Sequence, residues 1–554
     1  MRARYWAEGG GAALLLMLPF FFPLVAPGKM ALYHSEFPDR TLILGVLLDL
    51  AAFAVLFAIS VALVLRLPAR ARLLAGAVLA AGVLWRAGAA TAELLANSQP
   101  SRDAHGAGNS PRLAHFGQTW LRLSHGLAAG MLLLFLLLAM TAPSLLRVIV
   151  RGTRIGLAGF SFSLVWLAPM LLYLAIRPAE PQVHSAEAGG LPVATSRPQQ
   201  PRLVWILFDE LSYRLVFDQR PAGQEFPNLE KLHHQSFSFD NVEPVGFYTD
   251  HVIPSVLSGK EIDEVRSTAT GQLEYLGPHR QRWEAFNPEA TLFGLAQRDG
   301  WNPGVAGWWN PYCRIFTSML SECSWRTGGW NFSRLDLYGA SSDKPTAANA
   351  LVVPEYLVAR ALGTARSDIE QGCERHIGEY RSLMERAAAL IQDRQIHFVF
   401  LHLPVPHPPG IYDRHTHRLR AGGNYLDNLT LADDTLGKLM QEIETSGDGD
   451  RTTVIVSSDH SWRVPLWDST PEWTKEEEEI SHDNFDPRPV FLIHFPGETN
   501  GVEIRSVVPE LEEHDIIAGI LNGQIENGSQ MAALLHTEKI RVAGNEEERP
   551  EAGQ

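Results

Sequence analysis

Cysteine is scarce in this sequence: three occur among 554 residues, at positions 313, 323 and 373. That number excludes a disulfide-dense scaffold, and no CxxC pair is present that could form a zinc module. Cys313 and Cys323 bound a loop-like segment, "YCRIFTSMLSEC". A disulfide there, if the segment lies outside the cytoplasm, and two unpaired thiols are both open interpretations. Cys373 has no partner in the sequence, which indicates a buried or free thiol.

Basic tracts are also missing. The formal net charge is -15, and the acidic residues fall largely in the second half of the chain. Since no cluster of Lys and Arg offers a surface for nucleic acid, we expect no nucleic-acid partner. Long apolar runs are nearly absent after residue 177 but frequent before it. This contrast predicts two parts of different kinds.

The part before residue 177 has the composition of a membrane domain. A bilayer core requires about 20 apolar residues per helix. Five segments meet that requirement, namely 11–28, 42–65, 73–95, 123–142 and 155–176. A cleaved signal peptide would account only for the first of them. We therefore predict a domain of five transmembrane helices over residues 1–177, embedded in a membrane.

Arginines between these segments predict the orientation of the domain, because short cytoplasmic loops collect Arg and Lys. They precede the first segment and lie between the second and third and between the fourth and fifth: Arg2, Arg4, Arg66, Arg70, Arg72, Arg147, Arg151 and Arg154. The N-terminus is therefore expected in the cytoplasm. After five crossings, everything beyond residue 177 is expected outside.

The rest of the chain has the pattern of an α/β domain between two polar segments. Residues 178–200 are rich in Pro, Ala, Gly and Ser and are predicted to be a linker; residues 537–554 are charged and predicted to be disordered. Within 201–536, strands are expected at 202–210, 396–403, 452–460 and 488–497, and helices at 381–394 and 424–447. Apolar strands that alternate with helices predict a central, mainly parallel sheet.

In such a sheet, ligands bind beyond the carboxyl ends of the strands. Polar residues stand at three of these ends and at one helix start: Asp209, Glu210, His402, His407, Asp459, His460 and Thr249. Taken singly, an Asp-His pair can be a polar turn, and Asp-Glu or Thr can be a helix N-cap. Together they offer acids, imidazoles and a hydroxyl nucleophile. Mixed nitrogen and oxygen ligands suit Zn²⁺ or Mn²⁺ better than Ca²⁺.

Several motifs follow one another in a recognisable order: "ILFDEL", "TDHVIPSVLSG", "HLPVPHPP", and "VIVSSDHSW" followed by "DPRPVFLIHFPG". Over roughly residues 202–500 the sequence resembles the alkaline phosphatase/sulfatase superfamily. With transmembrane helices in front, it resembles the bacterial phosphoethanolamine transferases and the lipoteichoic acid synthase type of phosphoglycerol transferases. This resemblance implies a multi-pass protein of the bacterial inner (plasma) membrane with a periplasmic or extracellular catalytic domain.

The resemblance also implies roles for individual residues. Asp209, Thr249, Asp459 and His460 would hold one divalent metal ion, or share in holding two, and Thr249 would be the nucleophile. Glu210 would be a further ligand or simply a neighbour. His407 would meet the substrate phosphate or a second metal ion, and His482 would match another such histidine. In the mechanism that we expect, His407 or His402 transfers the protons.

The nucleophile position separates the candidate activities. Sulfatases carry Cys or Ser in a CxPSR pattern that is converted to formylglycine, whereas this chain has Thr249 and no such Arg. Phosphoryl transfer is therefore the leading expectation: a phosphoethanolamine or phosphoglycerol head group would move from a phospholipid donor to an envelope glycan or lipid acceptor through phospho-Thr249. The alternatives are a sulfatase-like phosphodiesterase or sulfuric ester hydrolase, and a non-catalytic membrane assembly protein.

One aromatic stretch, "GWWNPYC", remains open between two interpretations. Its large side chains, Trp308, Trp309 and Tyr312, could be ordinary buried packing. They could also form a wall that stacks on a glycan or lipid.

Overall fold

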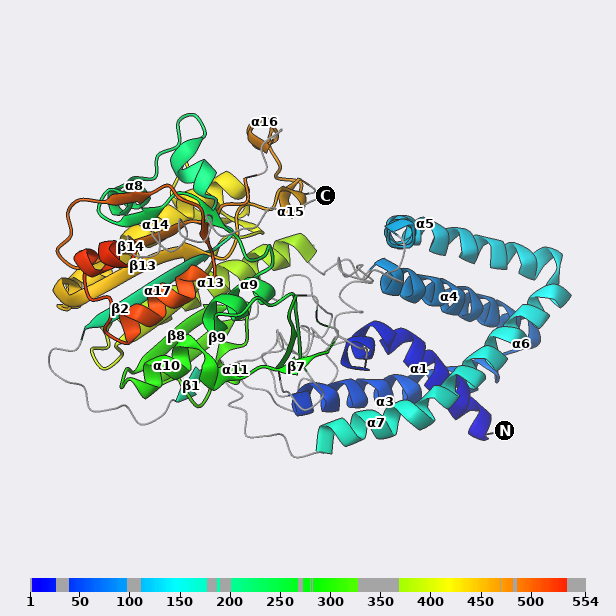
Figure 1. Cartoon of the computed structure of the whole chain (residues 1–554). Helices are drawn as coiled ribbons and strands as arrows, with labels where there is room; N and C mark the ends of the chain where they lie inside the picture. The colour runs from blue at the N-terminus through cyan, green and yellow to red at the C-terminus, as the bar shows by residue number, and fades with distance from the viewer. Residues whose placement is uncertain are drawn as a thin grey trace, which may run out of the picture. The chain divides into compact units, whose positions relative to one another are not determined.

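The computed structural model describes residues 2–25, 39–96, 111–176, 187–189, 201–267, 273–278, 280, 282–326, 368–468, 470–481 and 486–535. The chain divides into two compact units. The described residues of the first unit are the helices from α1 to α7, and those of the second run from β1 to beyond α17 (Figure 1).

The first unit is entirely helical where the structure describes it. Its elements are α1 (Arg2–Val25), α3 (Asp39–Val64), α4 (Ala69–Ala96), α5 (Pro111–Thr141), α6 (Pro143–Phe160), the 3-10 turn η1 (Ser161–Ser163) and α7 (Leu164–Ile176). Within the described residues, three helical stretches are long and apolar enough to cross a membrane: Ile43–Arg66, Ala69–Ala89 and Pro143–Tyr173. A fourth apolar helical stretch, Gly126–Thr141, is shorter.

These stretches support a membrane anchor but do not reproduce the five predicted spans. The segments at 42–65 and 73–95 match two of the three long stretches, and the segment at 155–176 largely falls within the third. The predicted span at 123–142 corresponds only to the shorter stretch, and the one at 11–28 extends beyond the described part of α1. The count of five and the orientation stay predictions.

The connection expected around Arg147, Arg151 and Arg154 is not a loop. Only Ala142 separates α5 from α6, and all three arginines lie on α6. Pro143 stands at the first helical position, where its missing N–H costs nothing. The prediction was wrong because the apolar residues between the arginines continue a helical pattern through them.

A buried ion pair between α1 and α6 was not predicted. The Glu8 carboxylate is fully buried and accepts hydrogen bonds from Arg154 Nε at 2.9 Å and Nη2 at 3.0 Å, and from Arg4 Nε at 2.9 Å. The helices approach closely here, because a Cβ added to Gly11 would lie 1.9 Å from the Leu157 carbonyl oxygen. Glycine at this position therefore permits the contact that places Glu8 beside Arg154.

The second unit is built on a nine-stranded sheet with the order β1-β9-β8-β10-β2-β13-β14-β3-β15. The central strands are β8 (Pro303–Trp308), β10 (Phe398–Pro406), β2 (Arg202–Asp209) and β13 (Thr452–Ser458), and they run parallel to one another. Towards one edge lie β9 (Glu322–Arg326) and β1 (Glu187–Gly189), and towards the other β14 (Phe491–His494), β3 (Phe237–Phe239) and β15 (Val502–Ile504). The predicted mainly parallel α/β fold is confirmed.

Helices cover both faces of this sheet, which explains why all eight residues of β2 are buried (Figure 1). Val204, Ile206 and Phe208 belong to a core shared with α13 (Asp368–Gln392) and α14 (Tyr425–Thr445). On the other face, Trp205 packs on Phe400, and α10 (Leu292–Arg298), α9 (Thr249–Ser258) and α17 (Glu512–Leu521) contact one another. A strand buried on both faces has no polar alternation, as its sequence indicated.

The remaining elements are short. They comprise α8 (Pro227–His233), α11 (Tyr312–Ile315), α15 (Val464–Trp467) and α16 (Lys475–Ser481), with small sheets formed by β11 (Gly410–Asp413) and β12 (Arg418–Gly423), by β4 (Val242–Glu243) and β16 (Val508–Pro509), and by β5 (Glu264–Ser267), β6 (Leu273–Leu276) and β7 (Glu284–Ala285). The predicted helix at 424–447 is α14, which starts with a capping box between Asn424 and Asp427.

The structure corrects the predicted linker at the start of this unit and decides whether its two neighbouring cysteines are bonded. Residues 187–189, placed in the predicted linker 178–200, form the edge strand β1 and pair antiparallel with β9; the polar composition hid a strand of only three residues. Cys313 and Cys323 form a disulfide, which decides between the two open interpretations. Cys373 is buried in α13. The predicted tail, 537–554, lies outside the described residues.

Candidate active site and metal centre

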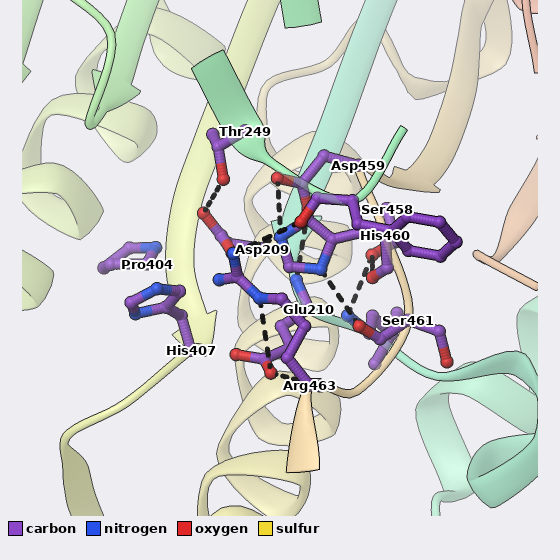
Figure 2. A network of polar contacts seen from close by, with 12 residues as sticks. Asp209, Glu210, Thr249, Pro404, His407, Ser458, Asp459, His460, Ser461 and Arg463 are labelled. Atoms are coloured by element: carbon purple, nitrogen blue, oxygen red, sulfur yellow. Dashed lines mark hydrogen bonds and ion pairs between the residues drawn. The ribbon is translucent and has the colours of Figure 1, made fainter. Parts of the chain in front are cut away.

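Three neighbouring strands deliver the predicted residues to one place. Asp209 is the last residue of β2, and His402 lies in β10 on one side of it. Asp459 and His460 follow β13 directly on the other side. Because the three strands are parallel, their carboxyl ends meet at one edge, and the side chains converge there (Figure 2).

Thr249 is the first residue of α9, and its hydroxyl donates a hydrogen bond to Asp209 Oδ2 at 3.1 Å. The hydroxyl also interacts with the Asp459 carboxyl. It is not a helix cap, because Tyr248 holds the cap position and no side chain bonds the end of the helix. The positive end of the α9 dipole points at this position, which favours negative charge on the Thr249 oxygen or on a group bound there.

Glu210 adopts a backbone conformation that is rare for a residue with a side chain, with φ at 75°. Two contacts hold it in place: the Tyr425 hydroxyl donates to its carbonyl at 2.8 Å, and the Arg463 backbone N–H donates to its Oε1 at 2.5 Å. Backbone strain of this kind, held by surrounding contacts, is concentrated at functional sites. The side chain is buried beside Asp209, so Glu210 is not a helix cap.

Three imidazoles near the acids have their Nδ1 atoms engaged in hydrogen bonds. His407 and His460 donate from Nδ1 to the carbonyls of Pro408 at 2.6 Å and Ser461 at 2.9 Å. The Nδ1 atom of His402 is hydrogen-bonded to the Tyr312 hydroxyl at 2.8 Å. With Nδ1 occupied by a carbonyl in His407 and His460, their Nε2 atoms are lone-pair acceptors.

Most of the nitrogen and oxygen atoms that face one another carry no hydrogen bond among the described residues; the exception is Asp209 Oδ2, which accepts the Thr249 hydroxyl. His460 Nε2 lies 3.5 Å from Asp209 Oδ1 and 3.3 Å from Asp459 Oδ2, and His402 Nε2 lies 3.4 Å from Asp209 Oδ2. Asp209 Oδ1, Asp459 Oδ2, Glu210 Oε2 and both Nε2 atoms are buried without a partner. Buried acceptors that converge without donors need a cation between them.

Two overlapping sets of these residues have ligand atoms within 4.8 Å of one another. One set is Asp209, His402 and Asp459, and the other is Asp209, Glu210 and His407. Both combine carboxylate oxygens with imidazole nitrogens, as a site for Zn²⁺ or Mn²⁺ would. The residues therefore fit a divalent metal ion.

Burial shifts the pKa of each acid and each imidazole in the cluster towards its uncharged form. Loss of solvent raises the pKa of Asp209 and of Asp459 to about 7 and that of Glu210 to about 8. The same loss lowers the pKa of His402 to about 4 and holds the pKa values of His407 and His460 well below the ordinary value. The imidazoles are therefore neutral, while the acids retain protons that a metal ion would displace.

Metal affinity should consequently rise with pH. Below about pH 7 the acids hold protons that must leave before a metal binds, whereas the neutral imidazoles impose no such cost. We expect the affinity to increase from about pH 6 to about pH 8, with proton release on binding. Calorimetric titration in buffers of different ionisation enthalpy measures both quantities. An affinity that is constant over this range would contradict the arrangement.

Arg463 belongs to the site but was not predicted from the sequence. Its Nε lies 3.7 Å from Glu210 Oε1 (Figure 2), and its Nη1 donates to the carbonyl of Phe247, two residues before Thr249 in the chain, at 3.3 Å. Burial raises the pKa of Asp209 and Glu210, and the positive charge of Arg463 partly opposes that rise. At His460 burial lowers the pKa, and the same charge lowers it further. The signal available in the sequence was a lone Arg four residues after Asp459, which many turns also contain.

Of the histidines predicted to meet the substrate, only one can be placed. His407 directly follows β10, and its backbone N–H donates to the Asp209 carbonyl at 3.1 Å. Its ring packs edge-to-face against Trp308, with centroids 4.8 Å apart. His482 lies outside the described residues. Trp308 and Tyr312 are fully buried, so the interpretation of these two as a stacking wall is wrong.

Solved structures with a similar fold include enzymes of two kinds. The phosphonate monoester hydrolase of Agrobacterium radiobacter is 13% identical and covers 58% of this chain and 74% of its own, with a TM-score of 0.36. A phosphonate monoester hydrolase from Silicibacter pomeroyi is 15% identical, with 58% and 73% covered and a TM-score of 0.36. The PsFucS1 sulfatase from Pseudoalteromonas sp. is 14% identical, with 58% and 68% covered and a TM-score of 0.37. No curated protein sequence matches this chain.

The sequence itself matches a family model across the domain that carries the site. The model is described as Sulfatase, and it covers residues 201–521, which is more than half of the chain. That range contains the sheet, the Thr249 helix and all the residues that converge on Asp209. The chain therefore belongs to the sulfatase family, within the alkaline phosphatase/sulfatase superfamily.

Proposed function

We propose that this protein is a membrane-anchored, metal-dependent phosphotransferase. It moves a substituted phosphate group, of the phosphoethanolamine or phosphoglycerol type, from a phospholipid to a hydroxyl of an envelope glycan or lipid. The family contains enzymes, and a hydrolase of phosphodiesters or sulfuric esters is the competing activity. The apolar helices of the first unit support a membrane anchor, which would keep the catalytic domain near a lipid donor.

The observation that carries this proposal is the placement of Thr249. Its hydroxyl stands at the N-terminus of α9 and bonds to Asp209 within the cluster of unpaired acceptors. A threonine cannot become formylglycine, so the route that sulfatases use for sulfate esters is closed. A hydroxyl in this environment supports attack on phosphorus, with a phosphothreonine as the covalent intermediate.

The charges of the site favour a phosphodiester. Asp209, Glu210 and Asp459 carry three negative charges when ionised, and a divalent ion together with Arg463 would offset them. A diester brings one further negative charge, whereas a monoester brings up to two. When bound, the metal ion would lower the pKa of the nucleophile's hydroxyl and offset charge on the phosphoryl oxygens.

The side chains of the protein account for the proton transfers. Thr249 Oγ1 forms a bond to phosphorus as the bond from phosphorus to the lipid oxygen breaks, and the hydroxyl proton ends on the departing diacylglycerol. In the second half, the acceptor hydroxyl bonds to phosphorus, and its proton returns to Thr249. His407 is suited to pass these protons, because its Nε2 is a free acceptor edge while Nδ1–H is fixed on Pro408.

The test uses the purified full chain, loaded with Zn²⁺ or Mn²⁺ and supplied with fluorescent phosphatidylethanolamine or phosphatidylglycerol. We expect release of fluorescent diacylglycerol that depends on an added glycan or lipid acceptor, with the phosphate group recovered on that acceptor. Release that is unaffected by any acceptor would replace transfer with hydrolysis. No release from either lipid, together with turnover of a sulfate ester, would overturn phosphoryl chemistry altogether.

A further inference from the structure

One short segment, residues 308–313, runs from the last residue of β8 into α11 and contacts the site at three points. The Trp308 ring packs on the ring of His407, and the Asn310 side chain donates to the Thr249 carbonyl at 3.4 Å. The Tyr312 hydroxyl is hydrogen-bonded to His402 Nδ1 at 2.8 Å. A segment with such contacts to the nucleophile and to two histidines does more than connect β8 to α11.

The position of Tyr312 within this segment is closely defined. The side chain is fully buried, and its ring packs edge-to-face on Phe400 with centroids 5.5 Å apart. A Cβ added to Gly307 would lie 2.3 Å from Tyr312 Cδ2, so only glycine at position 307 leaves room for the ring. The adjacent Cys313 is joined by the disulfide to Cys323 in β9, which pairs with β8. Packing and a covalent bond thus hold the hydroxyl in place.

Tyr312 is connected to the metal-ligand cluster through the imidazole of His402. His402 is fully buried, and the Trp308 backbone interacts with its ring in addition to Tyr312. With Nδ1 engaged, the ring directs Nε2 at Asp209, the same carboxylate that accepts the Thr249 hydroxyl. Hydrogen bonds to the far nitrogen of a ligating imidazole fix its orientation, and their removal typically weakens metal binding about 10–100-fold.

We infer that Tyr312 is a positioning residue of the metal centre: its hydroxyl orients His402 towards Asp209, and the Cys313–Cys323 disulfide keeps it there. This inference rests on the metal centre of the proposed function but not on the identity of the substrate. It predicts that loss of one buried hydroxyl changes the metal site while the packing of the domain persists.

Tyr312→Phe tests the inference in the full chain, because the ring and its packing remain. We expect Zn²⁺ affinity, measured by calorimetry, to fall about 10–100-fold. The visible absorption spectrum of the Co²⁺-loaded protein should change, since it reports ligand geometry. The melting temperature of the metal-free protein should fall only by the amount expected for the loss of one buried hydrogen bond, and the rise on adding Zn²⁺ should shrink.

Tyr380→Phe is the matched control. Tyr380 is also buried, and its hydroxyl bonds to Thr435 Oγ1 at 2.7 Å, between α13 and α14. Its loss should lower stability without altering metal affinity or the Co²⁺ spectrum. Two further variants address the supports of Tyr312: Gly307→Ala, and Cys313→Ser combined with Cys323→Ser. Each should weaken metal binding if it leaves the domain folded.

The outcomes separate the inference from the proposed function. If the wild type binds Zn²⁺ and Tyr312→Phe binds it equally well with the same Co²⁺ spectrum, the role of Tyr312 is refuted and the metal centre stands. If Tyr312→Phe and Tyr380→Phe lose affinity alike, the effect is general destabilisation and the inference also fails. If the wild type binds no divalent metal, the metal centre and the inference fall together.

Discussion

Replacement of Thr249 by alanine should abolish turnover, with a loss of about 10⁴-fold or more, because it removes the hydroxyl that would form the covalent intermediate. The substitution removes one hydrogen bond to Asp209 and little volume, so the domain should remain folded. Incubation of the wild type with lipid donor but without acceptor should leave the phosphate group on Thr249, detectable by mass spectrometry of the peptide. The variant should carry none.

Two matched changes make this result specific. Ser258→Ala removes a hydroxyl from the same helix, where it bonds only to backbone carbonyls, and should leave turnover near the wild-type level. Thr249→Ser retains the hydroxyl and should retain part of the activity. Full activity in Thr249→Ala, or a phosphorylated peptide elsewhere in the chain, would eliminate Thr249 as the nucleophile.

The second large effect is expected for Asp459→Asn, which is nearly isosteric. An asparagine oxygen can still accept the Glu210 N–H, now 3.2 Å from Asp459 Oδ1, but it has lost the negative charge that faces His460. Loss of a charged ligand should weaken metal binding by more than about 100-fold, since even removal of a supporting contact costs 10–100-fold. Elemental analysis and calorimetry measure the metal, and the lipid assay measures the activity.

Asp433→Asn provides the control for burial of a carboxyl group. Asp433 is also buried, but it accepts hydrogen bonds from Asn228 and from the Leu229 backbone between α14 and α8, away from the site. Its replacement should lower stability and leave the metal content unchanged. Wild-type metal content in Asp459→Asn would mean that the metal site is drawn wrongly, whatever happens to activity.

The sequence predicted the parts of the catalytic domain that depend on local pattern. Strand β2 could be located because six apolar residues in succession, 203–208, show no polar alternation before Asp209. The end of β13 could be located because its β-rich run, "TTVIVSS", leads directly into Asp459 and His460. Parallel pairing then brings these ends together, so the composition of the cluster followed from the fold class.

The rest of the site depends on contacts between segments that are far apart in the chain. Arg463 matters because its backbone and side chain reach Glu210, 253 residues earlier, and no local pattern records that contact. The bond between Tyr312 and His402 joins residues 90 positions apart. In the first unit, the apolar pattern of the helices gave no sign that Glu8 would be buried against Arg154. Such pairings are properties of tertiary packing alone.

The order of the central strands has a consequence for the way the protein is made. Strand β2 leaves the ribosome early, but Asp459, which bonds the Glu210 N–H beside it, is 249 residues further on. At about 5–20 residues per second, β2 waits on the order of 10–50 s for β13 to arrive. Both edges of this apolar strand are open until β10 is made, and one edge stays open until β13 is made, which is the condition that invites aggregation. Metal capture could not shorten the wait, because Asp459 and His460 follow β13. We therefore expect expression yield to depend on synthesis time as well as on the stability of the finished domain.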